Sequence, residues 1–215
     1  MFGYSNPEVR AVRSRVFLGL FGTLLAAAAG SVIGQFVPPT LTMFLMFAEI
    51  VMVFVASFVR RRRAVGWTFV FAFSVISGIT LTPILAYYTQ AIGVQMVQEA
   101  FIVTAAAFAV TAFVGSRKSL DFGWLGHLVF AALIVLLGLG VISFFVPFSS
   151  SLDFVYTYLG IAVFVGYLLF DVNRLTRYGV NPEQVPMVVL QLYLDFVNLF
   201  LFILRLFGLN LKPRS

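Results

Sequence analysis

The chain has 215 residues, of which 61% are hydrophobic and only 10% are charged, and its mean hydropathy is +1.04. A soluble globule of this length cannot bury so much apolar surface, so the composition indicates a polytopic membrane protein with one domain, residues 1–215. The absence of cysteine excludes disulfides and cysteine-ligated metal sites. The net charge of +6 comes from short arginine clusters between apolar stretches, which is typical of a topology signal and not of nucleic-acid binding.

Seven apolar stretches approach the length of about 20 residues that a membrane-spanning helix needs. They cover residues 14–36, 39–59, 65–88, 98–115, 123–146, 154–174 and 185–208. Short connections make successive helices antiparallel neighbours and leave no room for a soluble domain. In the first span, Gly30 and Gly34 have the spacing of small residues that allows helices to pack closely. The predicted fold is an all-α integral membrane protein with seven transmembrane helices.

Basic residues alternate between the two ends of the predicted spans. They occur before the first span and in the second, fourth and sixth connections, as Arg10, Arg13, Arg15, Arg60, Arg61, Arg62, Arg63, Arg117, Lys118, Arg174 and Arg177. The positive-inside rule therefore places the N-terminus and these connections in the cytoplasm. Arg205, Lys212 and Arg214 contradict this pattern if the seventh helix crosses fully. We expect a full crossing because the segment is long enough; the alternative is a re-entrant helix with its tail inside.

Two aspartates, Asp171 and Asp195, lie inside the sixth and seventh predicted spans. A carboxylate at this depth costs at least about 2.5 kcal/mol, so the default interpretation is a site: a proton relay, an ion pathway or a catalytic pair. The alternative is a buried hydrogen-bond network that only joins helices. Helical spacing places further polar residues on the same faces: Tyr167 and Arg174 in the sixth span, and Gln191, Asn198 and Arg205 in the seventh.

The lengths along the helices leave open whether the two aspartates meet. Straight helices around Val180 would leave about 9 Å between their levels, which an interfacial first turn near 181–183 could absorb. Two close carboxylates would share a proton and titrate in coupled steps. Glu49 and Arg60 share a face of the second span, and Arg60 lies at a depth similar to that of Asp171. Arg60 is thus either a latch on Asp171 that low pH weakens, or only an orientation signal.

A calcium ion is one cation that this pair of aspartates could bind. It takes six to eight oxygen ligands, whereas two carboxylates offer at most four. Water, carbonyl groups or Asn198 would have to supply the rest, so Asp171 and Asp195 would bind the metal loosely, as permeation requires. Glu49 and Glu99 are further candidates for an ion pathway, and each also fits a plain packing or interface role.

Seven features along nearly the whole chain carry a family pattern. They are IGQFVP (33–38), Glu49, RRRRAVG (60–66), SGITLTPI (77–84), EAFIVTAAAF (99–108), LLFDVN (168–173) and LYLDFVNLF (192–200). Together they resemble the transmembrane Bax inhibitor motif family, in particular its bacterial calcium-leak members of the YetJ type. Where the family commonly has Phe-Asp-Thr-Gln, this chain has Phe-Asp-Val-Asn, at residues 170–173.

The resemblance implies a seven-helix fold in which two three-helix layers surround a central seventh helix. It also implies a pH-sensitive calcium leak, in which Asp171 and Asp195 form the pH-sensing dyad and Arg60 pairs with Asp171. The predicted function is therefore a calcium leak channel gated by this dyad, and not an enzyme.

Two rival functions also use membrane carboxylates. A calcium/proton antiporter could use the same dyad for coupled exchange. An intramembrane aspartyl protease also uses two aspartates, although here Leu-Tyr-Leu-Asp replaces the Gly-x-Gly-Asp setting of its second one. We expect calcium ions, protons and lipid as partners, no cofactor, no nucleic acid, a monomeric state, and a multi-pass location in the inner membrane of a bacterium.

Overall fold

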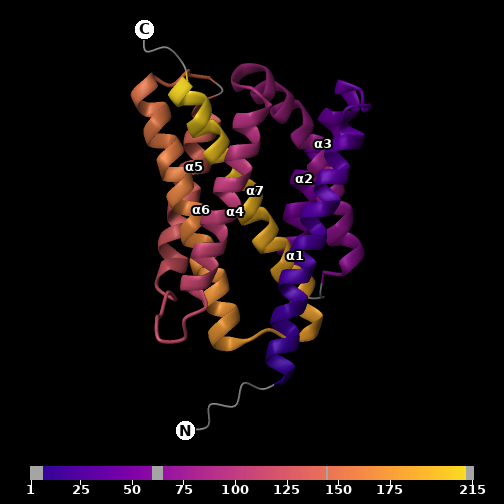
Figure 1. The fold of residues 1–215 in the computed structure, drawn as a ribbon, viewed down its shortest axis with the longest axis vertical. Coiled ribbons are helices and arrows are strands. Elements are labelled where there is room, and N and C mark those ends of the chain that lie inside the picture. Colours follow the sequence, from indigo (N-terminus) through magenta and orange to yellow (C-terminus); the bar gives the residue numbers. More distant parts are fainter. Residues whose placement is uncertain (1–6, 60–64, 144, 212–215) are drawn as a thin grey trace. The chain divides into compact units, whose positions relative to one another are not determined.

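The computed structural model describes residues 7–59, 65–143 and 145–211 (Figure 1). They form seven α-helices and one short 3-10 helix: α1 (Pro7–Gly34), α2 (Pro39–Val59), α3 (Trp67–Ile92), α4 (Val94–Gly115), α5 (Leu125–Ser143), α6 (Ser150–Tyr178), η1 (Pro182–Gln184) and α7 (Val185–Leu211). Each α-helix contains a segment long and apolar enough to cross a membrane. The prediction of an all-α protein with seven membrane-spanning helices is confirmed, and the described ranges contain no strand.

Several helices extend beyond the predicted spans. The third and fourth spans, predicted to end at 88 and to begin at 98, continue as helix to Ile92 and from Val94. The chain turns at Gly93, whose φ of 88° lies in a region that glycine adopts without strain. Polar residues between the two apolar runs suggested a longer loop, but such residues end the apolar pattern and not the helix.

Two compact units divide the chain. The first unit comprises residues 1–86 and 179–193, and the second comprises residues 87–178 and 194–215, so α3 and α7 contribute to both. The predicted single domain, with a central seventh helix between two three-helix layers, concerns both units together and stays a prediction. In the apolar stretch of α7, 56% of the residues are buried, against 11% in α2 and in α5. Polar side chains on α7 therefore have more protein and less lipid around them.

In the first unit, α1 packs against α3 through glycines. A Cβ atom at Gly30 would overlap the backbone of Val75, and one at Gly78 would overlap the backbone of Ala27. At Gly34, a Cβ atom would overlap the side chain of Thr82 on α3. The close packing predicted from the spacing of Gly30 and Gly34 is confirmed.

Gly30→Ala is expected to destabilise the protein by about 1–3 kcal/mol, because the new methyl group meets backbone atoms that cannot rotate away. The matched control is Gly138→Ala in α5, where a Cβ atom finds open space. That control should be neutral or slightly stabilising, since alanine is the better helix former by up to about 1 kcal/mol. Thermal unfolding in detergent measures both, and equal melting temperatures would argue against tight packing at Gly30.

In the second unit, α6 packs against both α4 and α5 (Figure 1). The later part of α7 also packs on α6, where the ring of Phe202 covers Gly160 so closely that a Cβ atom would overlap it. The Phe202 ring centroid lies 5.5 Å from that of Tyr156 and 5.9 Å from that of Phe164. Because these three α6 residues are one turn apart on a single face, Phe202 fixes the register of the two antiparallel helices.

Candidate cation site

The register set by Phe202 and Gly160 brings the two membrane aspartates to one region of the second unit. Asp195 lies seven residues before Phe202 on α7, about 10.5 Å along the helix axis. Tyr167 lies the same distance after Gly160 on α6, so it is level with Asp195. Asp171 lies one turn, about 6 Å, further along α6. The separation of about 9 Å expected for straight helices shrinks because η1 takes up chain before α7 begins.

Asp195 is the more enclosed of the two aspartates. It is 7% exposed, and its Oδ2 atom is buried without a hydrogen bond from the residues that the structure describes. Asp171 is half-buried. The charges of the two aspartates act on each other and on the hydroxyl group of Tyr167. Two carboxyl groups and a phenol therefore lie within electrostatic reach of one another.

The chemistry of this cluster follows from the buried oxygen of Asp195. A carboxylate oxygen without a donor is costly in surroundings of low polarity, and a proton, a water molecule or a cation relieves that cost. Two neighbouring carboxyl groups also titrate as a coupled pair and not independently. Within the described part of the chain, no group of three acidic, histidine or cysteine side chains forms a closed metal site. The cluster suits a proton or a partly hydrated cation.

Arg60 and Glu99 are two further residues that the sequence singled out. Arg60 lies outside the described residues, so its pairing with Asp171 stays a prediction. Glu99 is exposed on α4 and accepts a hydrogen bond of 3.2 Å from Gln95, one turn earlier. This contact lies within a single helix, so the role of Glu99 in an ion pathway also stays a prediction.

Asn198 lies one turn after Asp195 on α7. Its Nδ2 atom donates a hydrogen bond of 2.7 Å to the carbonyl oxygen of Leu194, on the preceding turn of the same helix. The donor end of the amide is thus directed to the backbone and its oxygen remains an acceptor, which is the polarity a passing cation requires.

Glu49 belongs to the first unit, where it joins α2 to α3. Thr80 Oγ1 lies 2.7 Å from Glu49 Oε2 and 3.0 Å from the carbonyl oxygen of Ser77. A hydroxyl group has one proton, so the carboxylate and the carbonyl compete for it. The charge of Glu49 also reaches the hydroxyl group of Tyr193, a fully buried residue on α7. Thr80 and Tyr193 were not predicted as partners of Glu49, although both lie inside the quoted family motifs.

Asn173 is a buried residue two positions after Asp171, and it was not among the predicted site residues. Its Nδ2 atom donates to the carbonyl oxygens of Gly115, at 3.1 Å, and Leu120, at 3.0 Å. Its Oδ1 atom accepts a hydrogen bond of 3.1 Å from the backbone nitrogen of Phe122. All of the donors of this amide are used, so Asn173 fixes the connection between α4 and α5 to α6.

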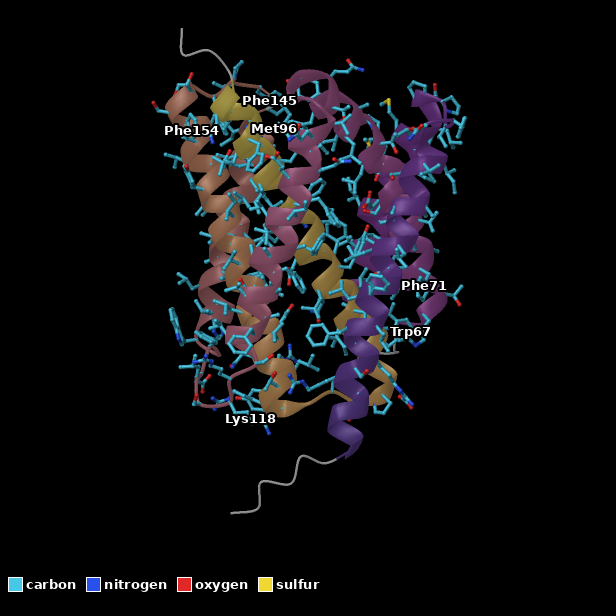
Figure 2. All side chains as sticks on the ribbon, in the orientation of Figure 1. Trp67, Phe71, Met96, Lys118, Phe145 and Phe154 are labelled. Carbon is cyan, nitrogen blue, oxygen red and sulfur yellow. The ribbon has the colours of Figure 1, made fainter. Side chains whose placement is uncertain are left out.

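Arg177, one turn further along α6, binds the same connection. It forms an ion pair of 3.1 Å with Asp121 and donates to the carbonyl oxygens of Leu120, at 3.1 Å, and Lys118, at 3.4 Å. Lys118 marks this connection in Figure 2. The segment of α6 that carries Asp171 is therefore attached to the loop between α4 and α5.

Comparisons with known proteins match most of the chain. A family model described as "Inhibitor of apoptosis-promoting Bax1" covers residues 9–212. Bax inhibitor 1 of Schizosaccharomyces pombe is 37% identical over 146 residues, which are 67% of this chain but 52% of that protein. The chain thus spans about half the length of this relative. Inner membrane protein YbhL of Escherichia coli is 32% identical over 178 residues, 76% of this chain and 73% of that protein. The Golgi anti-apoptotic protein of vaccinia virus (strain Lister) is 29% identical over 174 residues, 81% of this chain and 71% of that protein.

Proposed function

The chain belongs to the Bax inhibitor family of membrane proteins, and we propose that it is a calcium leak channel whose conductance depends on pH. The observation that carries the proposal is the buried Oδ2 atom of Asp195, which has no donor among the described residues and feels the charge of Asp171. A carboxyl pair at membrane depth needs a proton or a cation to be stable there. Binding of a proton in place of a cation, or the reverse, is the event that gates the path.

The gate operates through the charge of the pair. When both carboxyl groups are ionised, they attract a cation, and Asp171 also holds the guanidinium of Arg60, the proposed latch. A lower pH adds a proton to the pair, which removes the charge that holds Arg60. The latch then weakens, so calcium flux increases as the pH falls. Alkaline conditions restore the carboxylates and close the path.

Calcium would pass this site without a complete set of protein ligands. Asp171 and Asp195 supply at most four of the six to eight oxygens that calcium takes. Water and the oxygen of Asn198 supply others, and Glu49 and Glu99 line further parts of the proposed path. Incomplete coordination makes the ion bind weakly and leave quickly.

The membrane in question is proposed to be the inner membrane of a bacterium. The support is the match to YbhL, which is named as an inner membrane protein of Escherichia coli. Membership of the bacterial calcium-leak subgroup is consistent with this location and also stays a proposal.

A calcium/proton antiporter is the second candidate, because a proton-sharing carboxyl pair could exchange one ion for the other. The aspartyl protease reaction is not proposed, since the residues before Asp195 are Leu-Tyr-Leu and lack the glycines of that setting. Leak and exchange differ in one measurable way. A leak follows the calcium gradient alone, whereas exchange also follows an imposed proton gradient.

Calcium entry into dye-loaded proteoliposomes tests the proposal, with the same pH on both sides and values from 5 to 8. We expect entry that increases as the pH is lowered, with protein-free liposomes as the control. Calcium entry that occurs only when a proton gradient is directed out of the liposomes would identify an antiporter. Absence of entry at every pH would contradict both transport functions.

A further inference from the structure

Glu49 lies at the middle of a membrane span. It is ten residues, about 15 Å, from either end of α2, which runs from Pro39 to Val59. Thr80, which contacts it, is buried and lies near the middle of α3. A charge is costly at this depth in a bilayer. Whether Glu49 is charged therefore decides what it can bind.

Glu49 contacts protein on one side and is open to the apolar layer on the other. Thr42 and Ala56 lie two turns before and after it on the same stripe of α2, and both are buried. Glu49 itself is half-buried, and the nearby side chains of Phe47 and Ile50 are exposed. In the apolar stretch of α2 only 11% of the residues are buried. The carboxyl group thus contacts α3 and remains accessible from the lipid side.

No described cation of the first unit balances a negative charge on Glu49. The ion pairs among the described residues do not include it. The charged residues of α1 end at Arg15, twelve residues, about 18 Å, before Ala27, which packs against Gly78 on α3. From α7, the group within electrostatic reach of Glu49 is the neutral hydroxyl group of Tyr193. The described groups that face Glu49 from other helices are therefore hydroxyl groups.

The hydrogen bonds at Glu49 contain too few protons if its carboxyl group is ionised. Thr80 Oγ1 lies 2.7 Å from Glu49 Oε2 and 3.0 Å from the carbonyl oxygen of Ser77. An ionised carboxylate only accepts hydrogen bonds, so the single hydroxyl proton of Thr80 would have to serve both oxygens. A protonated carboxyl group removes this conflict, because each of the two short distances then has a proton of its own.

We propose that Glu49 is a proton-binding site of the first unit: it is a neutral carboxylic acid that donates to Thr80, which in turn donates to Ser77. An acid that is taken out of water without a cation beside it is more stable in its neutral form. Glu49 therefore holds its proton between pH 5 and pH 8.

The proton site at Glu49 differs from the aspartate pair of the second unit. Asp171 and Asp195 act on each other's titration, whereas the described neighbours of Glu49 on other helices are hydroxyl groups. Its proton is not shared with a second acid. In the proposed calcium path Glu49 is a neutral lining group, and it binds its proton whether or not calcium passes.

Infrared spectra of the protein in lipid bilayers test for this proton directly. A protonated carboxyl group has a C=O stretching band that an ionised carboxylate lacks. The difference between the wild type and Glu49→Gln should contain this band at pH 5 and at pH 8, and heavy water should shift it to lower frequency. Carboxylate bands in its place at pH 8 would overturn the proton site.

Thr80→Val tests the direction of the hydrogen bond. Valine has nearly the shape of threonine but no hydroxyl group, so a protonated Glu49 loses its acceptor. Its C=O band should remain and move to higher frequency. The matched control is Thr42→Val, the same change at a buried threonine of α2 whose hydroxyl group lies 3.3 Å from the carbonyl oxygen of Pro38. This control should leave the band where it is, and an unchanged band in Thr80→Val would contradict donation to Thr80.

Dicyclohexylcarbodiimide gives a second readout that needs no substitution. This apolar reagent reacts with protonated carboxyl groups. The acid proton moves to a nitrogen of the reagent, the carboxyl oxygen bonds to its central carbon, and transfer of the acyl group to nitrogen leaves a stable N-acylurea. Mass spectrometry of peptides should find this adduct on Glu49 at pH 5 and at pH 8.

Glu99 is the internal control for this reaction, because it is exposed on α4. Its adduct should decrease between pH 5 and pH 8 as an exposed carboxyl group ionises, whereas the adduct on Glu49 should not. An adduct on Glu49 that decreases in parallel with the one on Glu99 would overturn the proton site.

These measurements use no calcium, so the proton site and the calcium leak fail separately. Absence of calcium entry into proteoliposomes would remove the leak function and leave the proton on Glu49. Carboxylate bands at pH 8 would remove the proton site and leave the test of the leak unchanged.

Discussion

Asp195→Asn is expected to remove most of the pH dependence of calcium flux. Asparagine has nearly the same shape as aspartic acid but cannot ionise, so no proton can be shared between the two side chains. We expect the leak to stay near the low level that the wild type shows at pH 8, because Asp171 is retained and still holds the proposed Arg60 latch. Across this range the flux of the variant should vary by less than about twofold, since the coupled pair no longer exists. Calcium entry into proteoliposomes at fixed pH on both sides measures the effect.

Asp171→Asn, in contrast, should raise the leak at pH 8, because a neutral amide does not hold the proposed Arg60 latch. The matched control is Asp121→Asn, the same change at an exposed carboxylate of the second unit, which pairs with Arg177. This control should leave the pH dependence unchanged, as surface ion pairs contribute at most about 1 kcal/mol. If Asp195→Asn retained the wild-type pH profile, the aspartate pair would not be the sensor.

The seven helices were predictable from the sequence because membrane spans are local. Each span is a run of apolar residues, and its helix satisfies its own backbone, so no information about distant contacts is needed. The turn at Gly93 was missed for the same reason. Polar residues near the end of α3 and the start of α4 interrupt the apolar runs. The helices themselves continue up to Gly93, where a glycine can turn the chain.

Only part of the candidate site was predictable. Carboxylates within apolar runs are conspicuous in a sequence, whereas the residues that they contact are not. Asp171 and Asp195 stood out by their cost in a membrane. Asp153 did not, because the predicted sixth span began one residue after it, and Arg205 looked only like an exception to the topology rule. The ion pair that they form depends on the register between α6 and α7, which Phe202 sets by packing over a single glycine. No local pattern reports that contact.

Asn173→Asp is expected to destabilise the protein by about 3–5 kcal/mol, the cost typical of a buried charge that loses its partner. The asparagine is 2% exposed, and its Nδ2 atom donates to two carbonyl oxygens. Aspartate would place a charged oxygen against both carbonyls and keep only the hydrogen bond from Phe122. The loop between α4 and α5 should then separate from α6 near Asp171. Thermal unfolding in detergent measures the loss.

Asn173→Ala separates the two causes of that loss. Alanine removes the three hydrogen bonds but adds no charge, so it should cost less than aspartate, about 1–3 kcal/mol for the buried groups left without partners. Arg177→Gln, on the same face but exposed, should cost less again because water replaces its contacts. The loss of stability should therefore decrease from Asn173→Asp to Asn173→Ala to Arg177→Gln, an order that follows from burial and charge alone. If Asn173→Asp were as stable as the wild type, the amide would not be what attaches the loop to the helix that carries Asp171.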